Sequence, residues 1–384
     1  MNGQTGYFKV AIDIQNLLNT KTGVGHYVYE LASSLSELKA DADFFLFYFS
    51  RNRSLNLPFL NNRARQHRIT SQTIRLYGLL WKYLQFPAID RFLPKVDILH
   101  FPNFFIRPFK HGKCVLTIHD LSFIRYPQFT EPKNLKFLTK QVKMAVHRAD
   151  KIIADSDFTR NEIIDVYDVT PSNVVTVYPG IRNVFREPVS PRAIESVRKN
   201  YNLEGRFILF VGTIEPRKNL LGLIEGFRIM RESSPHFRDV KLVICGMSGW
   251  LFETTLKRME QPDVADGIVR TGYISDEDLP ALYSAAEALA LPSWYEGFGF
   301  PCVEAMACGV PVLCSKDSSM SEITKDASVL VDPARTESIA EGLIRILSDS
   351  ESRKNLVTKG KLLAKNYLWE RTAKETYEVY KSLL

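Results

Sequence analysis

Two glutamates, Glu296 and Glu304, are the residues of this sequence best placed to do chemistry together. A helix is predicted over residues 301–308, because Pro301 suits the first helical position and Gly309 suits the left-handed residue just past the end. Glu296 then lies in the loop before this helix, and Glu304 lies one turn inside it. We therefore expect both carboxylates to face one cavity above the helix N-terminus.

The loop before this helix is rich in glycine. Gly297 and Gly299 flank Phe298 and leave backbone N–H groups uncovered. Together with the positive end of the helix dipole, such groups favour an anionic or hydroxyl-rich ligand. After the helix, the apolar run that starts at Pro311 is typical of a parallel strand buried on both faces.

Two adjacent cations, Arg217 and Lys218, stand in a similar position earlier in this half of the chain. The apolar run 207–211 predicts a buried strand, Gly212 and Thr213 follow it directly, and a helix is predicted after the cations. A guanidinium and an ammonium group beside exposed amides are what a diphosphate requires. An Arg-Lys pair by itself is commonplace and usually solvated, so the argument depends on this position.

His119 follows a strand predicted over residues 115–118, at the end where ligands bind in open α/β sheets. A single histidine more often has a structural role, and its residue type leaves both interpretations open. Gly23 and Gly25 lie where the first predicted strand, 8–14, leads into a helix. They form only a weak fragment of a phosphate-binding turn.

The order of elements predicts an α/β protein. Apolar runs of strand length alternate with amphipathic helices in both halves of the 384 residues, which indicates two doubly wound parallel sheets, each with its own core. The proline-bearing stretch 185–191 is predicted to be the linker between them. Residues 369–384 are predicted to form a final amphipathic helix.

The residues around the two glutamates resemble a known family. The run E-G-F-G-F-P-x-x-E-A-M-A-x-G-x-P-V, which starts at Glu296, resembles the signature of retaining glycosyltransferases of family 4, which have the GT-B fold. The resemblance implies two Rossmann-like domains that face each other across a cleft. It implies an acceptor-binding domain over 1–187, a nucleotide-sugar-binding domain over 188–367, and a helix over 368–384 that packs back on the first domain.

The resemblance also implies roles for individual residues. The diphosphate is assigned to the two cations, a sugar hydroxyl and the developing positive charge to Glu296, and the ribose to Glu304. The catalytic set is His119, Glu296, Arg217 and Lys218, and the donor-binding set is Gly23, Gly25, Gly212, Thr213, Tyr273, Ile274, Gly297, Phe298, Gly299 and Glu304. No metal ion is expected, because in GT-B enzymes basic side chains and helix dipoles stabilise the leaving diphosphate.

The implied substrates are a nucleotide sugar and a glycan. The stretches G-T-I-E-P-R-K-N and I-H-D-L-S-F-I-R-Y-P resemble bacterial mannosyltransferases of polysaccharide and O-antigen assembly, which makes GDP-mannose the leading donor. UDP-glucose, UDP-N-acetylglucosamine and dTDP-rhamnose stay open as donors. The expected acceptor is a glycan, either free or linked to polyprenyl diphosphate.

The charge of +7 is concentrated in the first half of the chain. Residues 1–190 contain 25 Lys and Arg against 16 Asp and Glu, and no acid occurs between Asp43 and Asp90. The basic segment 51–86 also contains aromatic residues, so it could lie against anionic lipid. A solvated basic surface is the competing interpretation. Nucleic acid is not expected as a partner, since no nucleic-acid-binding pattern accompanies the charge.

Five cysteines without a C-x-x-C pair predict neither a disulfide framework nor a zinc site. With no signal peptide or membrane-spanning run recognised, we expect a cytoplasmic protein, peripheral to the inner face of the cytoplasmic membrane if the basic segment contacts lipid.

Other functions fit the sequence less well. A nicotinamide-dependent oxidoreductase would need a G-x-G-x-x-G turn after the first strand, and this is missing. A non-catalytic sugar-nucleotide-binding protein, a phosphorylase and an epimerase remain alternatives on the same fold. Two D-x-D pairs are not interpreted as metal sites. The first, at Asp41, abuts a strand, and the second belongs to the stretch 155–158, which is predicted to cap a helix.

Overall fold

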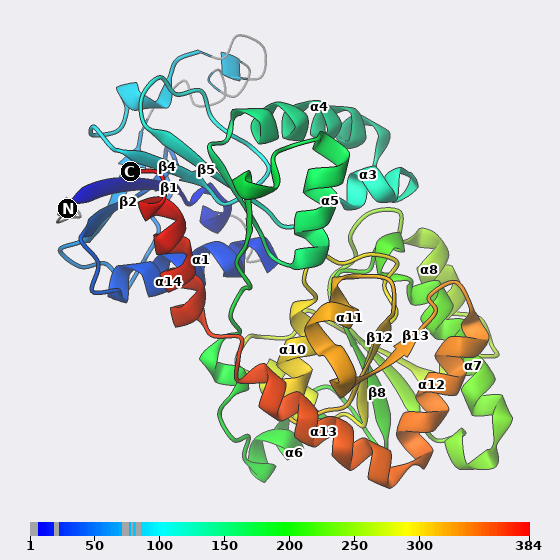
Figure 1. Ribbon diagram of the computed structural model, residues 1–384. Coiled ribbons are helices and arrows are strands. Elements are labelled where there is room, and N and C mark those ends of the chain that lie inside the picture. Colours follow the sequence, from blue (N-terminus) through cyan, green and yellow to red (C-terminus); the bar gives the residue numbers. More distant parts are fainter. Residues whose placement is uncertain (1–6, 19–22, 71–76, 78–79, 82–85) are drawn as a thin grey trace. The chain divides into compact units, whose positions relative to one another are not determined.

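The computed structural model describes residues 7–18, 23–70, 77, 80–81 and 86–384, which form two compact units (Figure 1). Unit 1 comprises Met1–Leu121, Lys136–Gly180 and Leu368–Leu384, and unit 2 comprises Ser122–Leu135 and Ile181–Tyr367. The boundary expected at residue 187 lies inside unit 2. The segment Ser122–Leu135, which comes from the first half of the sequence, also belongs to unit 2.

Unit 1 is built on a parallel sheet with the order β3-β2-β1-β4-β5-β6-β7 among the described residues. Its strands are β1 (Phe8–Asp13), β2 (Ala42–Phe49), β3 (Ala64–Ile69), β4 (Ile98–Phe101), β5 (Lys113–Ile118), β6 (Lys151–Ala154) and β7 (Val174–Thr176). The inner strands are buried almost throughout, which explains their apolar sequences. Strand β3 was not predicted, because an edge strand with the sequence ARQHRI lacks the apolar run of a central strand.

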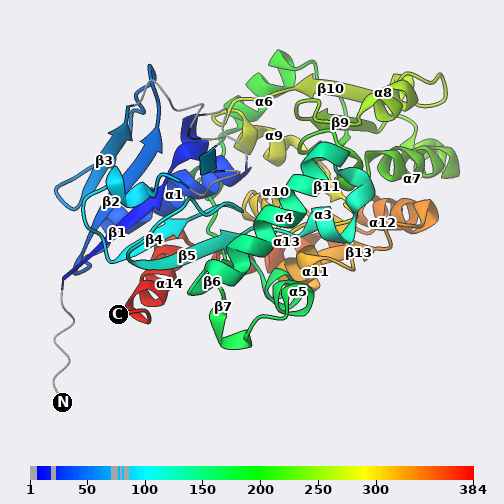
Figure 2. The same cartoon turned by 90° about the horizontal axis from the view of Figure 1, so that it is seen from above.

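Among the described residues, the helices of unit 1 include α1 (Gly23–Glu37), most of α4 (Pro132–Arg148), α5 (Asp157–Tyr167) and α14 (Trp369–Lys381). The last helix of the chain therefore belongs to the first unit, and Figures 1 and 2 show it beside β1 and β4. The Tyr380 hydroxyl lies 2.7 Å from His100 Nδ1, and Thr117 Oγ1 lies 2.8 Å from His100 Nε2. Gly180 is needed where the chain passes the start of α14, since a Cβ there would lie 2.2 Å from the Trp369 backbone nitrogen.

Unit 2 contains a second parallel sheet, with the order β10-β9-β8-β11-β12-β13 among the described residues. Its strands are β8 (Phe207–Val211), β9 (Lys241–Cys245), β10 (Ile268–Gly272), β11 (Ala288–Leu291), β12 (Val312–Ser315) and β13 (Ser328–Val331). Its helices are α3 (Ser122–Arg125), α6 (Pro191–Asn200), α7 (Leu220–Ser233), α8 (Glu253–Met259), α9 (Leu279–Ala285), α10 (Phe300–Ala307), α11 (Ser319–Thr324), α12 (Thr336–Ser348) and α13 (Ser350–Ala364). Two doubly wound sheets confirm the predicted α/β class.

The strand order of unit 2 reverses between β8 and β11, which pair in parallel with Leu289 opposite Leu209. At such a reversal the connections leave neighbouring strands in opposite directions and open a space at their carboxyl ends, where α/β proteins bind ligands. The loop after β8 contains the predicted cations, and the loop after β11 contains Glu296. The fold thus places them at the same point of one sheet.

Candidate active site

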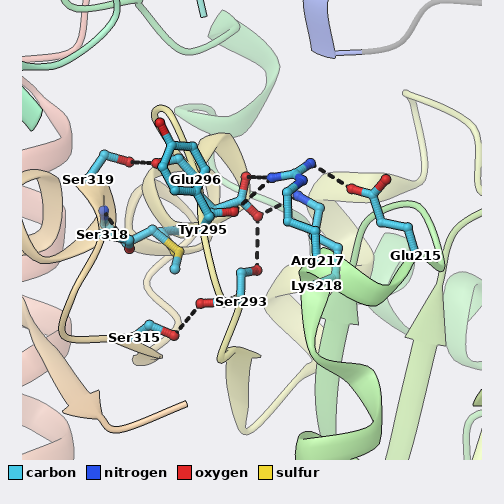
Figure 3. Close-up of polar contacts among 11 residues, drawn as sticks. Glu215, Arg217, Lys218, Ser293, Tyr295, Glu296, Ser315, Ser318 and Ser319 are labelled. Carbon is cyan, nitrogen blue, oxygen red and sulfur yellow. Dashed lines mark hydrogen bonds and ion pairs between the residues drawn. The ribbon is translucent and has the colours of Figure 1, made fainter. Parts of the chain in front are cut away.

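Glu296 and the two cations form one buried cluster at the carboxyl ends of β8 and β11 (Figure 3). Lys218 Nζ donates to Glu296 Oε1 at 2.5 Å, and Arg217 Nη1 donates to Glu296 Oε2 at 3.0 Å. Ser293 Oγ donates to the same Oε1 at 2.9 Å. Both oxygens of this carboxylate are therefore held by charged or polar donors of unit 2.

The surroundings of Glu296 keep it ionised. Burial alone would raise the pKa of this carboxyl, but Lys218 and Arg217 outweigh burial and lower the pKa to about 2. Since the side chain is only 8% exposed, solvent screens these interactions little. The cluster can hold a fixed negative charge where positive charge develops on a substrate.

A second carboxylate, Glu215, completes the charge balance of the cluster. Arg217 Nη2 donates to Glu215 Oε1 at 2.6 Å, while the buried Glu215 Oε2 has no hydrogen-bond partner within the described part of the chain. The two carboxylates and two cations sum to zero net charge. Sequence reasoning missed Glu215, although its place two residues before Arg217 at a strand end was a usable signal.

The loop that presents Glu296 is fixed by hydrogen bonds to its backbone. Ser315 Oγ donates to the Ser293 carbonyl at 2.6 Å, and Ser319 Oγ donates to the Glu296 carbonyl at 2.7 Å. The Trp294 N–H donates to the Arg217 carbonyl at 2.9 Å, which joins this loop to the one after β8. These hydrogen bonds preorganise the cluster.

The signature helix α10 begins at Phe300, one residue before the predicted start. Gly299 has a φ of 91° and Gly309 a φ of 75°, so both require the left-handed conformation that glycine adopts readily. The Phe298 ring is buried against Phe300 and Tyr367, so only its backbone can contact a ligand. Gly297, buried before it, belongs to the same turn.

Glu304, on α10, has a partner on α9. The Tyr283 hydroxyl donates to Glu304 Oε2 at 2.8 Å, and the other oxygen accepts no hydrogen bond from the residues described. Burial raises the pKa of this carboxyl, against the lowering effect of Arg182 and Tyr283. Glu304 is partly exposed, so its second oxygen is available to hydroxyl groups.

The glycine turns after β8 and β9 touch each other. Gly212 has a φ of 151° and lies beside the Lys218 side chain, and a Cβ on Gly246 would fall 1.9 Å from the Gly212 carbonyl oxygen. Thr213 is exposed beside this turn. Two residues were predicted at the nucleotide base. The Tyr273 side chain is 58% exposed and is accessible to a ligand, whereas Ile274 is buried.

His119 pairs with Asp155, a residue that was predicted to belong to a helix cap. His119 Nδ1 lies 2.8 Å from Asp155 Oδ2, and Nε2 lies 3.2 Å from the Pro102 carbonyl, which can only accept. Burial lowers the pKa of His119, but Asp155 outweighs burial and raises it. In the register of β5 and β6, Ile118 is opposite Ala154, so both side chains follow paired strand ends.

The stretch 155–158, which was predicted to cap a helix, does so through Ser156 and not through Asp155. Ser156 is the cap of α5, where its Oγ accepts from the Thr159 N–H at 3.1 Å, because its position allows the short hydroxyl to reach the first turn. His119 and Asp155 both belong to unit 1. So do Gly23 and Gly25, which lie in the first turn of α1 rather than in a loop before it.

Comparison with known proteins identifies the family. The chain matches the models described as Glycosyltransferase Family 4 over residues 21–183 and Glycosyl transferases group 1 over residues 192–363. It is 31% identical over 375 residues to the O-antigen chain mannosyltransferase B of Escherichia coli, covering 94% of this chain and 96% of that protein. It is 32% identical over 283 residues to a D-inositol 3-phosphate glycosyltransferase of Salinispora tropica, covering 69% of this chain and 58% of that protein.

A solved structure, that of Anabaena HepE in complex with UDP-glucose, has the same GT-B fold. The TM-score is 0.72 at 16% identity, over 98% of this chain and all of that one. The signature, the two sheets and a relative this similar over nearly its full length lead to one conclusion: the chain is a glycosyltransferase and belongs to glycosyltransferase family 4.

Proposed function

We propose that the enzyme transfers mannose from GDP-mannose to a hydroxyl of a lipid-linked or oligosaccharide acceptor, with retention of anomeric configuration, in the assembly of a bacterial surface polysaccharide. The observation that carries the choice of sugar is the 31% identity to an O-antigen mannosyltransferase over almost the whole chain. The buried cluster of cations and carboxylates at the β8–β11 reversal supports the chemistry.

Arg217 and Lys218 bind the diphosphate in this proposal. A guanidinium and an ammonium group at one buried position neutralise the negative charge that grows on the leaving group. The backbone amides of Gly212, Thr213 and the Gly297–Gly299 turn orient the phosphate oxygens. Since both cations contact Glu296, the diphosphate has to share them with that carboxylate.

Glu296 then faces the donor sugar. It accepts a hydrogen bond from a sugar hydroxyl and stabilises positive charge near the ring as the bond from C1 to the phosphate oxygen breaks. The acceptor oxygen forms the new bond to C1 on the same face, and its proton passes to the departing phosphate oxygen, so GDP leaves. No covalent enzyme intermediate is needed.

The nucleoside and the remaining contacts complete the assignment. Glu304 accepts hydrogen bonds from both ribose hydroxyls, and Tyr273 and Ile274 flank the base. From unit 1, the backbone of Gly23 and Gly25 at the start of α1 contacts the substrates, and His119 orients the sugar. Asp155 holds the His119 ring.

A resident metal ion has no part in this proposal. Within the described residues, no group of three or more His, Cys, Asp and Glu side chains is arranged to hold one. The test is direct: transfer in the presence of EDTA is expected to match transfer in its absence. A requirement for added Mg²⁺ would contradict the assignment of the diphosphate to the two cations.

The acceptor is proposed to be presented at the cytoplasmic face of a membrane, with the basic segment 51–86 nearby. Two of its arginines are already used locally, because Arg63 Nη1 donates to the Ala40 carbonyl and Arg65 Nε to the Asn62 carbonyl. Arg75, Lys82 and Tyr83 lie outside the described residues. No helix in the described ranges is long and apolar enough to cross a bilayer.

The donor is tested with a panel of GDP-mannose, UDP-glucose, UDP-N-acetylglucosamine and dTDP-rhamnose. Thermal stabilisation and slow donor hydrolysis are measured for each. We expect GDP-mannose to give the largest shift and the only hydrolysis above background. A larger response to any other donor would replace the proposed substrate. Thermal stabilisation by a donor without any hydrolysis would leave a non-catalytic sugar-nucleotide-binding protein as the better account.

A further inference from the structure

Five aromatic side chains of unit 2 form a row that starts in the loop after β11. The ring centroids of Tyr126 and Trp294 are 6.4 Å apart, and those of Tyr126 and Tyr295 are 6.2 Å apart. Tyr126 stacks on Phe129 at 5.6 Å, with 5° between the ring planes. The Phe129 carbonyl accepts a hydrogen bond from Trp250 Nε1 at 2.7 Å. We refer to Trp250, Phe129, Tyr126, Trp294 and Tyr295 as the aromatic row.

Two of these rings come from the first half of the sequence. Tyr126 and Phe129 belong to the segment Ser122–Leu135, which is part of unit 2. This segment includes most of the run I-H-D-L-S-F-I-R-Y-P and a 3₁₀ turn over Pro127–Phe129. In a 3₁₀ turn, side chains three positions apart lie above one another, which explains why the two rings stack.

Trp250 comes from the loop after β9. Gly249, just before it, donates its N–H to the Ile214 carbonyl at 3.0 Å, and a Cβ on Gly249 would lie 2.5 Å from Thr213 Cγ2. The loop therefore packs directly on the residues that follow β8. Leu251, just after the tryptophan, has a φ of 52°, a left-handed conformation that is unfavourable for a branched side chain. Such strain persists where the surrounding contacts enforce it, so the position of the indole is tightly held.

The other end of the row touches the candidate active site through its backbone. The Tyr295 carbonyl accepts from Arg217 Nη1 at 2.8 Å, as Figure 3 shows. The Trp294 N–H donates to the Arg217 carbonyl at 2.9 Å. Glu296, which is assigned to the donor sugar, is the next residue of the chain. The row therefore leads away from the position proposed for sugar transfer and ends at Trp250.

The row offers aromatic surface along most of its length. Trp250 is 39% exposed, and Tyr126, Phe129 and Trp294 are half-buried, whereas Tyr295 is buried behind them. A ligand on this surface would contact more than one ring.

Polar side chains border the aromatic surface. Arg125 and Gln128, each next to one of the stacked rings, are exposed, and so is Ser248, two residues before Trp250. A pyranose has an apolar face of C–H groups and a rim of hydroxyl groups. Its C–H groups match the negative face of an aromatic ring, and its hydroxyls require polar partners nearby. The tail of a lipid would cover the polar groups without pairing them, so a sugar chain fits this surface better.

We propose that the aromatic row binds the acceptor glycan, an α-linked mannosyl chain, by stacking its rings on successive sugar units. The inference deepens the proposed function and rests on it for the choice of mannose. It assigns the acceptor to a surface that begins beside Glu296 and includes a segment from the first half of the sequence.

The test measures binding of an α-linked mannotriose and of methyl α-mannoside to the full chain by titration calorimetry. Trp250→Ala removes the exposed ring, whereas Trp250→Phe keeps a ring and removes the indole N–H that binds the Phe129 carbonyl. The matched control is Leu362→Ala, which removes another exposed apolar side chain of unit 2, on α13. Circular dichroism and thermal unfolding check that all three variants fold.

The wild type should bind mannotriose more tightly than methyl α-mannoside, because only the trisaccharide spans several rings. Alanine in place of an aromatic anchor weakens binding by roughly ten-fold or more, whereas changes outside the binding surface stay within about two-fold. We therefore expect W250A to lose affinity for mannotriose by the first factor and L362A to stay within the second. W250F should bind more like the wild type than like W250A, since it retains a ring for stacking.

Three results would overturn the proposal. The wild type could fail to bind mannotriose, or W250A could bind it as well as L362A does. Equal losses in W250A and W250F would show that the indole N–H only holds the loop in place. Binding of geranylgeranyl phosphate instead of mannotriose, lost in W250A, would assign the row to the lipid part of an acceptor and replace the glycan.

Two outcomes separate this inference from the proposed function. Binding of mannotriose by the wild type without any response to GDP-mannose would contradict the proposed function and leave the aromatic row as a glycan-binding surface. A response to GDP-mannose without binding of mannotriose would do the reverse.

Discussion

The substitution Glu296→Gln separates binding of the diphosphate from transfer of the sugar. The amide keeps the size of the side chain and one acceptor for Ser293, but it removes the charge that pairs with Lys218 and Arg217. One end of the amide must also turn an N–H₂ group toward a cation. Because a bound diphosphate no longer shares these cations, we expect the variant to bind GDP at least as tightly as the wild type.

Transfer should change in the opposite direction. A lost contact to developing charge in a buried site lowers turnover by roughly 10²- to 10³-fold. We therefore expect kcat for transfer from GDP-mannose to fall by this factor, while the affinity for GDP, measured by titration calorimetry, holds or increases. This combination distinguishes a catalytic carboxylate from one that only supports the loop.

Stability gives an independent measure of the same ion pairs. The pKa of Glu296 is lowered from 4.5 to about 2, which corresponds to roughly 3 kcal/mol of unfolding free energy. A carboxyl with a lowered pKa stabilises the fold fully above about pH 4.5, and this contribution is lost as the pH falls through about 2. The variant should therefore be about 3 kcal/mol less stable at pH 7, and the difference should shrink below pH 4.5.

The matched control is Glu287→Gln, just before the opposite end of the same strand, β11. Glu287 pairs with Arg353 and lies 3.9 Å from Arg206, so this variant also loses a carboxylate from an ion pair. Its transfer rate should equal that of the wild type. The reasoning is refuted if Glu296→Gln keeps kcat within a few-fold, or if both variants lose transfer equally.

Two further perturbations test the fold around the site. Gly246→Ala should lower the free energy of unfolding by about 2–4 kcal/mol and weaken donor binding, because its Cβ would lie 1.9 Å from the Gly212 carbonyl oxygen. The control Gly205→Ala, at a φ of 69° with no atom within 4 Å of the new Cβ, should lower it by only about 1–2 kcal/mol. Equal losses of stability in chemical denaturation would count against this packing argument. Burial lowers the pKa of His100 from 6.5 to about 3. Unit 1 should therefore lose about 1.4 kcal/mol of stability per pH unit below pH 6.5, because the unfolded chain takes up a proton that the native ring does not. A His100→Gln variant whose stability falls with pH in the same way as that of the wild type would contradict this.

The sequence predicted the parts of this structure that follow from local pattern. Apolar runs such as 207–211 and the glycine after the signature helix specify strands and a helix end by their own chemistry. The resemblance supplied the significance of Glu296, which two isolated glutamates would not have conveyed. The edge strand β3 was missed, since its polar residues resemble a loop.

Pairings between distant elements could not be read from local pattern. Asp155 meets His119 only because β5 and β6 are neighbours with a defined register, and Glu215 matters because Arg217 bridges it to another loop. The same holds for Gly180, whose missing side chain makes room for the start of α14. Such partners depend on tertiary contacts that a linear pattern does not specify.

The account depends most on where a diphosphate binds. A crystal structure of the protein with GDP would measure this directly. We expect oxygens of the diphosphate within hydrogen-bond distance of Lys218 Nζ and the Arg217 guanidinium. A diphosphate bound elsewhere, with both cations still paired only to Glu296 and Glu215, would contradict the account.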